Sequence, residues 1–223
     1  VYRTKDYGKT WTRIVDGTDV QSYALSIVED LETPNLLFLG TDDGLYISVD
    51  AGNKWTKWTN GFPTVSVKDL VIHPREHDLV IGTFGRAAWV LDDIRPLREM
   101  AKNTGVISSK LQLFDPPTAY QASYQQATGT RFGADAMYNG ENRNGGAQIS
   151  YYVSIEDEKD NAIKDDKKKD DDEDKNSETS DVKVKWDSVH MNIYDGDRLI
   201  RTLKQKAPKE SGVHKWTWGM DEK

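Results

Sequence analysis

Apolar residues in the first hundred positions gather in short runs that glycine, aspartate and proline interrupt, a pattern typical of β-strands. The runs recur in the same order along successive segments. The expected first strands span 23–28 and 65–73, the second 36–40 and 79–83, the third 45–48 and 87–91, and the fourth 11–15 and 55–58. The second strands are almost continuously apolar, which predicts burial on both faces.

A turn motif separates third from fourth strands. The pattern Ser/Thr-x-Asp-x-Gly-x-x-Trp occurs at residues 4–11 and again at 48–55, a spacing of 44 positions. In matching second strands, Gly82 follows Gly40 by 42 positions. A period in the low forties is typical of four-stranded propeller blades.

The residues of this motif favour a structural role. The aspartate side chain can accept backbone N–H groups, the glycine can adopt a positive φ, and the tryptophan can fill the space between neighbouring sheets. The residues concerned are Asp6, Gly8, Thr10 and Trp11 in the first copy and Ser48, Asp50, Gly52 and Trp55 in the second.

The two copies resemble Asp-boxes, also called BNR repeats, of sialidase-like and sortilin-like β-propellers. The resemblance extends over residues 35–41 and 67–93, and the run 82–94 is similar to the last blade of bacterial sortilin-like, "glycosyl hydrolase-like" proteins. It implies an all-β chain in which residues 1–97 form the C-terminal blades of a propeller. It also implies that the Asp-box is a folding device, remote from any catalytic face.

The blade pattern stops after Asp92, where residues 93–98 indicate a short helix in place of another Gly-x-x-Trp. The last blade is therefore expected to lack its fourth strand. About two and a half blades are too few for a ring of four to eight. We expect either more sequence upstream, since the chain starts at Val1 without an initiator Met, or a partner chain that completes the propeller.

The second half of the chain lacks the blade pattern of the first half. Residues 98–146 are rich in Gly, Asn, Gln and Pro and predict a linker with a short strand at 111–114. Residues 147–223 predict strands at 147–153, 189–194, 198–203 and 212–218, the middle two joined as a hairpin by Asp195-Gly196. This half resembles part of the immunoglobulin-like or fibronectin-III-like β-sandwich that follows the propeller in the same bacterial family.

A block of charged residues at about 158–181 predicts a disordered surface loop. Calcium binding by its carboxylates is the alternative interpretation, but the run lacks the alternating ligands and turn glycine of a calcium loop.

The composition of the chain argues against several classes of function and of binding site. The net charge of −7 argues against nucleic acid as a partner, and no apolar run is long enough to span a membrane. The absence of cysteine excludes disulfides and thiolate metal sites. No phosphate-binding, dinucleotide or nucleophile-elbow motif occurs, so no cofactor is expected.

A sialidase-like mechanism needs an arginine cluster, a nucleophilic Tyr–Glu pair and an acidic Asp. Arg3, Arg86 and Arg95 are available, but they do not assemble into such a set. No catalytic residue is therefore assigned. Arg86, beside Gly85 at the start of a third strand, is the candidate ligand contact, with a surface or inter-blade salt bridge as the alternative.

Two further residue pairs have competing interpretations. His73 and His77 are separated by Pro74 and cannot share one helical face, so no metal site is expected. Glu29 and Asp30 end a first strand and indicate a solvated loop.

Two tryptophan pairs could stack on carbohydrate, with core packing as the alternative. They are Trp55 with Trp58 and Trp216 with Trp218.

These observations favour a non-enzymatic, extracytoplasmic binding or scaffold protein whose propeller face binds a peptide, protein or glycan ligand; the compartment follows from the resemblance. The first alternative is an exo-glycosidase whose catalytic residues lie outside this sequence. The second is a structural subunit of an envelope assembly whose open edges another chain fills.

Overall fold

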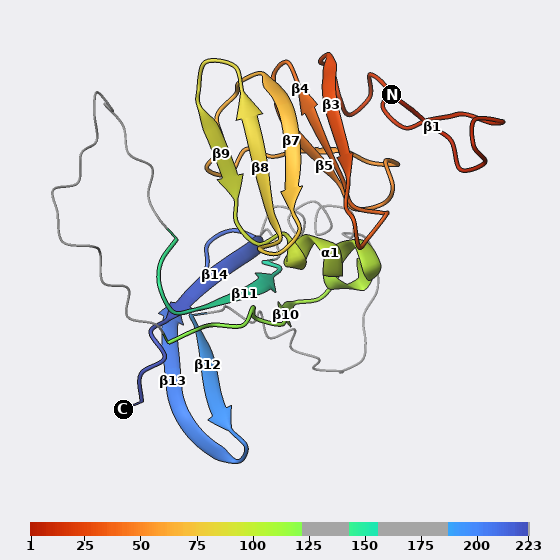
Figure 1. Ribbon diagram of the computed structural model, residues 1–223. Coiled ribbons are helices and arrows are strands. Elements are labelled where there is room, and N and C mark those ends of the chain that lie inside the picture. Colours follow the sequence, from red (N-terminus) through yellow and green to blue (C-terminus); the bar gives the residue numbers. More distant parts are fainter. Residues whose placement is uncertain (122–142, 156–186, 223) are drawn as a thin grey trace, which may run out of the picture. The chain divides into compact units, whose positions relative to one another are not determined.

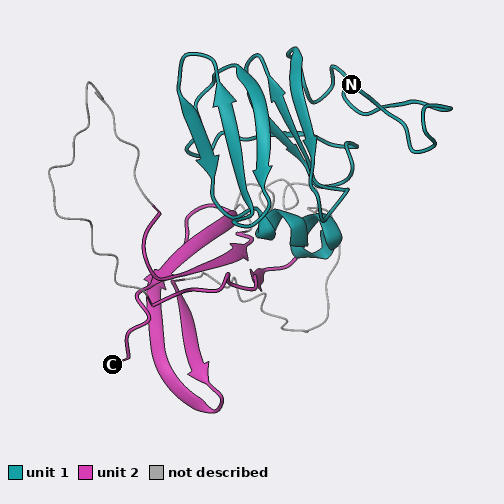
Figure 2. Ribbon diagram, in the orientation of Figure 1, with its two compact units in different colours: residues 1–108 teal, residues 109–223 magenta. Residues whose placement is uncertain are grey.

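The computed structural model describes residues 1–121, 143–155 and 187–222. The chain divides into two compact units, residues 1–108 and 109–223 (Figure 2). Antiparallel strands form nearly all of the regular structure in the described residues, which confirms the expected all-β, propeller-like class. No described helix is long and apolar enough to cross a membrane.

The first sheet of unit 1 is a four-stranded antiparallel meander (Figure 1). Its strands, in spatial and chain order, are β3 (Ala24–Glu29), β4 (Leu37–Thr41), β5 (Gly44–Ser48) and β6 (Thr56–Lys57). Each lies in an expected run, and β4 and β5 are buried throughout. Before this sheet, β1 (Tyr2–Arg3) pairs with β2 (Thr12–Arg13) around the first Asp-box.

The second sheet repeats the order with three strands. They are β7 (Val67–His73), β8 (Asp78–Thr83) and β9 (Ala88–Leu91). After β9 the chain enters the helix α1 (Arg95–Lys102) instead of a fourth strand. The helix has Pro in its first turn, and Asn103 follows it and accepts the Gly105 N–H at 2.9 Å to begin the 3₁₀ turn Thr104–Val106.

The two sheets have the same cross-strand register. One row of directly opposed residues in the first sheet consists of Val28, Phe38 and Ile47, and its counterpart in the second consists of Val71, Val80 and Val90. The first row packs into the core that the two sheets share, where Phe38 is fully buried. The second row is open, with Val71 and Val90 each 55% exposed and Val80 36% exposed.

Gly40 allows the two sheets of unit 1 to pack closely against each other. A Cβ atom at this position would lie 2.7 Å from Val67 Cγ1, 2.9 Å from Val67 O, and closer still to Ser26 Oγ. At the equivalent Gly82, the nearest atom to such a Cβ is Asp69 Cβ at 3.6 Å, an ordinary contact. The glycine of the first repeat is therefore a packing requirement, whereas that of the second is not.

Unit 2 contains a sheet of β10 (Leu111–Leu113), β11 (Ala147–Val153) and β14 (Gly212–Trp218), together with the hairpin of β12 (Ser188–Asp195) and β13 (Arg198–Lys206). The hairpin turn contains Gly196 at φ 57°. Residues from both parts form one core, made of Ile149, Tyr151, Val189 and Trp216. The charged block at about 158–181 lies outside the described residues.

Helix and strand also occupy part of the segment 98–146 that was expected to be a linker. The helix α1 continues to Lys102, and β10 pairs with β11. Short apolar groups within a polar segment account for both elements, because Met100 and Ala101 are buried with unit 1 while Phe114 is buried after β10.

Candidate functional site

The two Asp-boxes have nearly identical hydrogen bonds. Thr4 Oγ1 donates to Asp6 Oδ1 at 2.8 Å, and the N–H of Gly8 donates to Thr4 Oγ1 at 2.8 Å. In the second box, Ser48 Oγ donates to Asp50 Oδ1 at 2.8 Å and accepts the Gly52 N–H at 2.9 Å. The carboxylate and hydroxyl are therefore used within the turn.

The backbone of both turns needs two consecutive left-handed residues. Tyr7 and Gly8 have φ of 57° and 87°, and Ala51 and Gly52 have φ of 64° and 90°. Glycine adopts this conformation without a Cβ penalty, which is why the motif places it there.

The aspartate of each box also accepts a backbone N–H four residues on. Thr10 N donates to Asp6 Oδ1 at 2.8 Å, and Lys54 N donates to Asp50 Oδ1 at 2.9 Å. Thr10 adds a second bond from its hydroxyl to Asp6 Oδ2 at 2.6 Å. These bonds, those from Thr10 above all, lower the pKa of Asp6 from 3.8 to about 2.

The two tryptophans of the boxes differ. Trp55 is 5% exposed, and its indole N–H donates to the Ile14 carbonyl at 2.7 Å, so it fills the space beside the preceding segment as expected. Trp11 is 60% exposed, and its N–H donates within its own turn, to Gly8 O at 3.1 Å. The expectation that Trp11 fills a space between sheets is wrong for the described residues, because no segment packs on it as Ile14 does on Trp55.

A third turn of the same chemistry lies between β4 and β5, outside the Asp-box pattern. Thr41 Oγ1 donates to Asp43 Oδ1 at 2.8 Å and accepts the Asp43 N–H at 3.3 Å, while Lys57 Nζ lies 2.8 Å from Asp43 Oδ2. Burial works to raise the pKa of Asp43, but the bonds from Lys57 and Thr41 outweigh it and lower the pKa. The spacing Thr-x-Asp was the signal available in the sequence.

The β8–β9 turn carries the candidate ligand contact, Arg86. Gly85 and Ala87 have φ of 84° and 60°, and the Ala87 carbonyl accepts from the backbone and hydroxyl of Thr83. The indole N–H of Trp89 donates a hydrogen bond to the Arg86 carbonyl at 2.8 Å. The backbone of Arg86 is thus fixed at both sides, while its side chain is exposed and pairs with no acidic group in the described part of the chain.

An aromatic ring and a second cation accompany Arg86. Phe84 is 74% exposed in the same turn, and Lys68 Nζ lies 5.7 Å from the centre of its ring. Beneath the turn, Trp89 packs edge-to-face on the buried Phe62 at 5.4 Å. We refer to Lys68, Phe84 and Arg86 as the turn patch.

The opposite end of the sheets contains a buried ion-pair cluster. The guanidinium of Arg98, on α1, donates from Nη2 to Asp30 Oδ1 at 2.8 Å and from Nη1 to Glu32 Oε1 at 2.9 Å. Nη1 also lies 2.7 Å from His77 Nδ1, which must accept, because arginine only donates. The side chains of Arg98 and Asp30 are 3% and 0% exposed.

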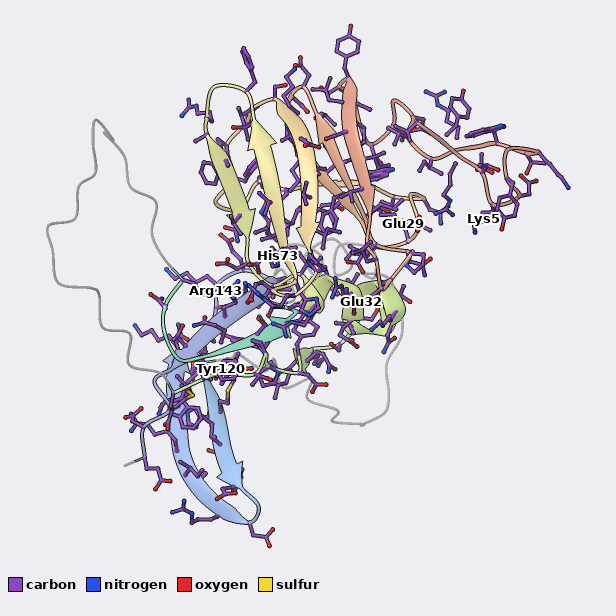
Figure 3. The ribbon with its side chains drawn as sticks, viewed as in Figure 1. Lys5, Glu29, Glu32, His73, Tyr120 and Arg143 are labelled. Atoms are coloured by element: carbon purple, nitrogen blue, oxygen red, sulfur yellow. The ribbon has the colours of Figure 1, made fainter. Side chains whose placement is uncertain are left out.

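The interpretation of Asp30 as part of a solvated loop is therefore wrong. Its Oδ2 also accepts the backbone N–H groups of Glu32 and Thr33, so the carboxylate closes the β3–β4 turn while it binds the helix. Figure 3 labels Glu29, Glu32 and His73 at this end, near α1. The cluster joins α1 to the turns of both sheets.

The remaining candidates have structural contacts. His73 Nδ1 accepts the Glu76 N–H at 3.1 Å, and Arg95 pairs with Asp93 at 2.5 Å. Trp216 is buried in the core of unit 2, with Trp218 partly buried against it. Trp58 is likewise partly buried, against the core of unit 1. Within the described residues, no group of three His, Asp or Glu side chains is placed to hold a metal ion.

Comparison with known families gives one match. The family model Sortilin-Vps10, described as "Sortilin, neurotensin receptor 3", matches residues 1–115. Neither the search of curated proteins nor the search of solved structures gave a match.

Proposed function

The chain belongs to the Sortilin-Vps10 family, and on that premise we propose that it is a non-enzymatic binding module that acts in an extracellular or luminal compartment. Residues 1–97 would form propeller blades, and residues 147–223 part of an immunoglobulin-like domain. The family match supports a propeller-type binding or scaffold role, and the turns of the blades supply a candidate surface.

The observation that carries the proposal is the turn patch. Arg86 and Phe84 are exposed although hydrogen bonds fix the backbone of their turn. Loops held by a rigid scaffold are common binding elements, and aromatic residues are enriched among the residues that dominate binding. The first Asp-box also exposes the rings of Tyr7 and Trp11, but the carboxylates of both boxes are used inside the turns.

The chemistry of the patch selects the ligand class. A guanidinium with free N–H donors binds a carboxylate in a two-point geometry, and an exposed ring next to it accepts an apolar side chain. Lys68 adds a second positive charge over the ring of Phe84. We therefore propose a peptide or protein segment that carries a carboxylate beside an apolar residue; a glycan is the alternative ligand.

A selection from a random peptide library on the immobilised chain, followed by affinity measurement, tests the proposal. Arg86→Ala should weaken binding of the selected peptides by about 10- to 100-fold, since a hydrogen bond to a charged group contributes about 1.5–3 kcal/mol. Arg75→Ala is the matched control, because Arg75 lies in the β7–β8 turn, at the opposite end of the same sheet, with 81% of its side chain exposed. Binding that Arg86→Ala leaves unchanged would refute the assignment.

The open valine row supports a second candidate, a scaffold in which another β-sheet covers this face. The second sheet covers the equivalent row of the first sheet, and the two sheets have the same cross-strand register. Sedimentation equilibrium tests this: association that Val80→Lys abolishes and Arg75→Ala preserves would favour it. A monomer at all concentrations would count against self-association through this face.

A further inference from the structure

Unit 2 contains a cavity of about 240 Å³ that is separate from the proposed ligand surface of unit 1. Its walls come from β11, from the end of β13, from the β13–β14 connection and from β14. The whole cavity therefore belongs to one compact unit.

The charge around this cavity is positive. Lys206, Lys209 and Lys215 line it together with a single acidic residue, Glu210. Lys206 and Lys209 form no ion pair with an acidic group in the described residues. In a chain of net charge −7, such a group of lysines favours an anionic ligand.

A largely buried tyrosine in the cavity wall is a second observation. Tyr151 lines the cavity, and its side chain is largely buried, with 3% exposed. Its ring contacts those of His214 and Trp216, each with its centre 5.6 Å away. A phenol hydroxyl in the wall of a cavity can donate a hydrogen bond to a ligand oxygen.

The protonation of this hydroxyl suits an acceptor ligand. Burial raises the pKa of Tyr151, so the phenol keeps its proton at neutral pH. It can therefore donate to an oxyanion, as the lysine ammonium groups also do.

The size and the remaining walls define the ligand further. The volume is several times the roughly 30 Å³ that a water molecule occupies, and below the range of about 300–1,000 Å³ typical of larger ligands. Pro208 and the rings of Tyr151 and His214 give an apolar wall, and the Gln205 amide can bond to hydroxyl groups. We propose that this cavity binds a single sugar acid, whose oxyanion contacts the lysines and the Tyr151 hydroxyl while its ring lies on the aromatic wall.

An NMR titration of the ¹⁵N-labelled full chain with glucuronate, at constant ionic strength, tests the proposal. We expect saturable shifts of the amides of Glu210, His214 and Lys215, weaker shifts with acetate, and none with glucose. Lys206→Gln/Lys209→Gln should weaken glucuronate binding by at least about tenfold. Tyr151→Phe keeps the packing, removes only the hydroxyl, and should weaken binding to a smaller extent.

The control variant is Lys204→Gln, which removes a charge from the same strand β13 at a residue that does not line the cavity. It should leave the affinity unchanged. Shifts that do not saturate, an equal loss of affinity in Lys204→Gln, or binding of sulfate as tight as that of glucuronate would overturn the sugar-acid assignment.

Discussion

Removal of the Arg98 guanidinium is expected to be among the most damaging single changes in unit 1. Arg98→Met leaves the Asp30 carboxylate fully buried without its cation, although two backbone N–H groups still donate to it. The loss of one partner of a buried ion pair costs about 3–5 kcal/mol. Because two backbone hydrogen bonds to Asp30 remain, we expect a loss at the low end of this range, about 3 kcal/mol. That is a large part of the roughly 5–15 kcal/mol by which a typical domain is stable.

Urea unfolding followed by tryptophan fluorescence measures this loss. Lys102→Met on the same helix is the matched control, because the side chains of Lys102 and its partner Glu99 are 51% and 52% exposed and the pair should contribute less than about 1 kcal/mol. Asp30→Asn/Arg98→Met should recover part of the loss, since it removes the unpaired charge. A loss below about 1 kcal/mol for Arg98→Met, or equal losses for Arg98→Met and Lys102→Met, would refute the reasoning.

Two further predictions concern the first Asp-box turn and the close packing of the two sheets of unit 1. In the folded chain Asp6 has a pKa of about 2, below 3.8, so its contribution to stability is complete above pH 3.8 and is lost as the pH falls through about 2. A ¹³C NMR titration of its carboxyl should show this midpoint, and a midpoint of 3.8 or higher would contradict the hydrogen-bond geometry. Gly40→Ala should lower the free energy of unfolding by about 1–3 kcal/mol through overpacking. Gly82→Ala, at the matching position, should change it by less than about 1 kcal/mol, and equal urea midpoints for the two variants would show that the close approach at Gly40 is not a constraint.

The repeated strands could be predicted because their signals are local. Alternating and continuous apolar runs define β3 to β9 to within a few residues, and the spacing of the two Asp-box motifs indicates the repeat. The hairpin of β12 and β13 was equally evident from Asp195-Gly196 between two apolar runs.

The ion-pair cluster could not be predicted from local pattern, because its partners are far apart in the chain. Asp30 and Arg98 are separated by 68 positions, and Asp30 follows a strand as many solvated residues do. One signal was present: Arg98 lies four residues after Ile94 and three before Ala101, on the buried side of α1. A charged residue on such a face indicates a buried partner.

The cavity in unit 2 was hidden for a different reason. Tyr151 is one of the seven residues of β11 and has the pattern of a core position, so nothing in the sequence shows that it lines a cavity. The lysines around it come from β13, β14 and their connection, which only the folded unit brings together.

The central claim is that the β8–β9 turn binds ligand whereas the Asp-box end serves the fold. Hydrogen–deuterium exchange of the chain with and without a selected peptide tests this most directly. We expect the peptide to slow exchange at residues 83–88 and to leave residues 48–55, in the second Asp-box, unchanged. Slowed exchange at 48–55 with none at 83–88 would contradict the claim and place the ligand at the end that we assign to folding.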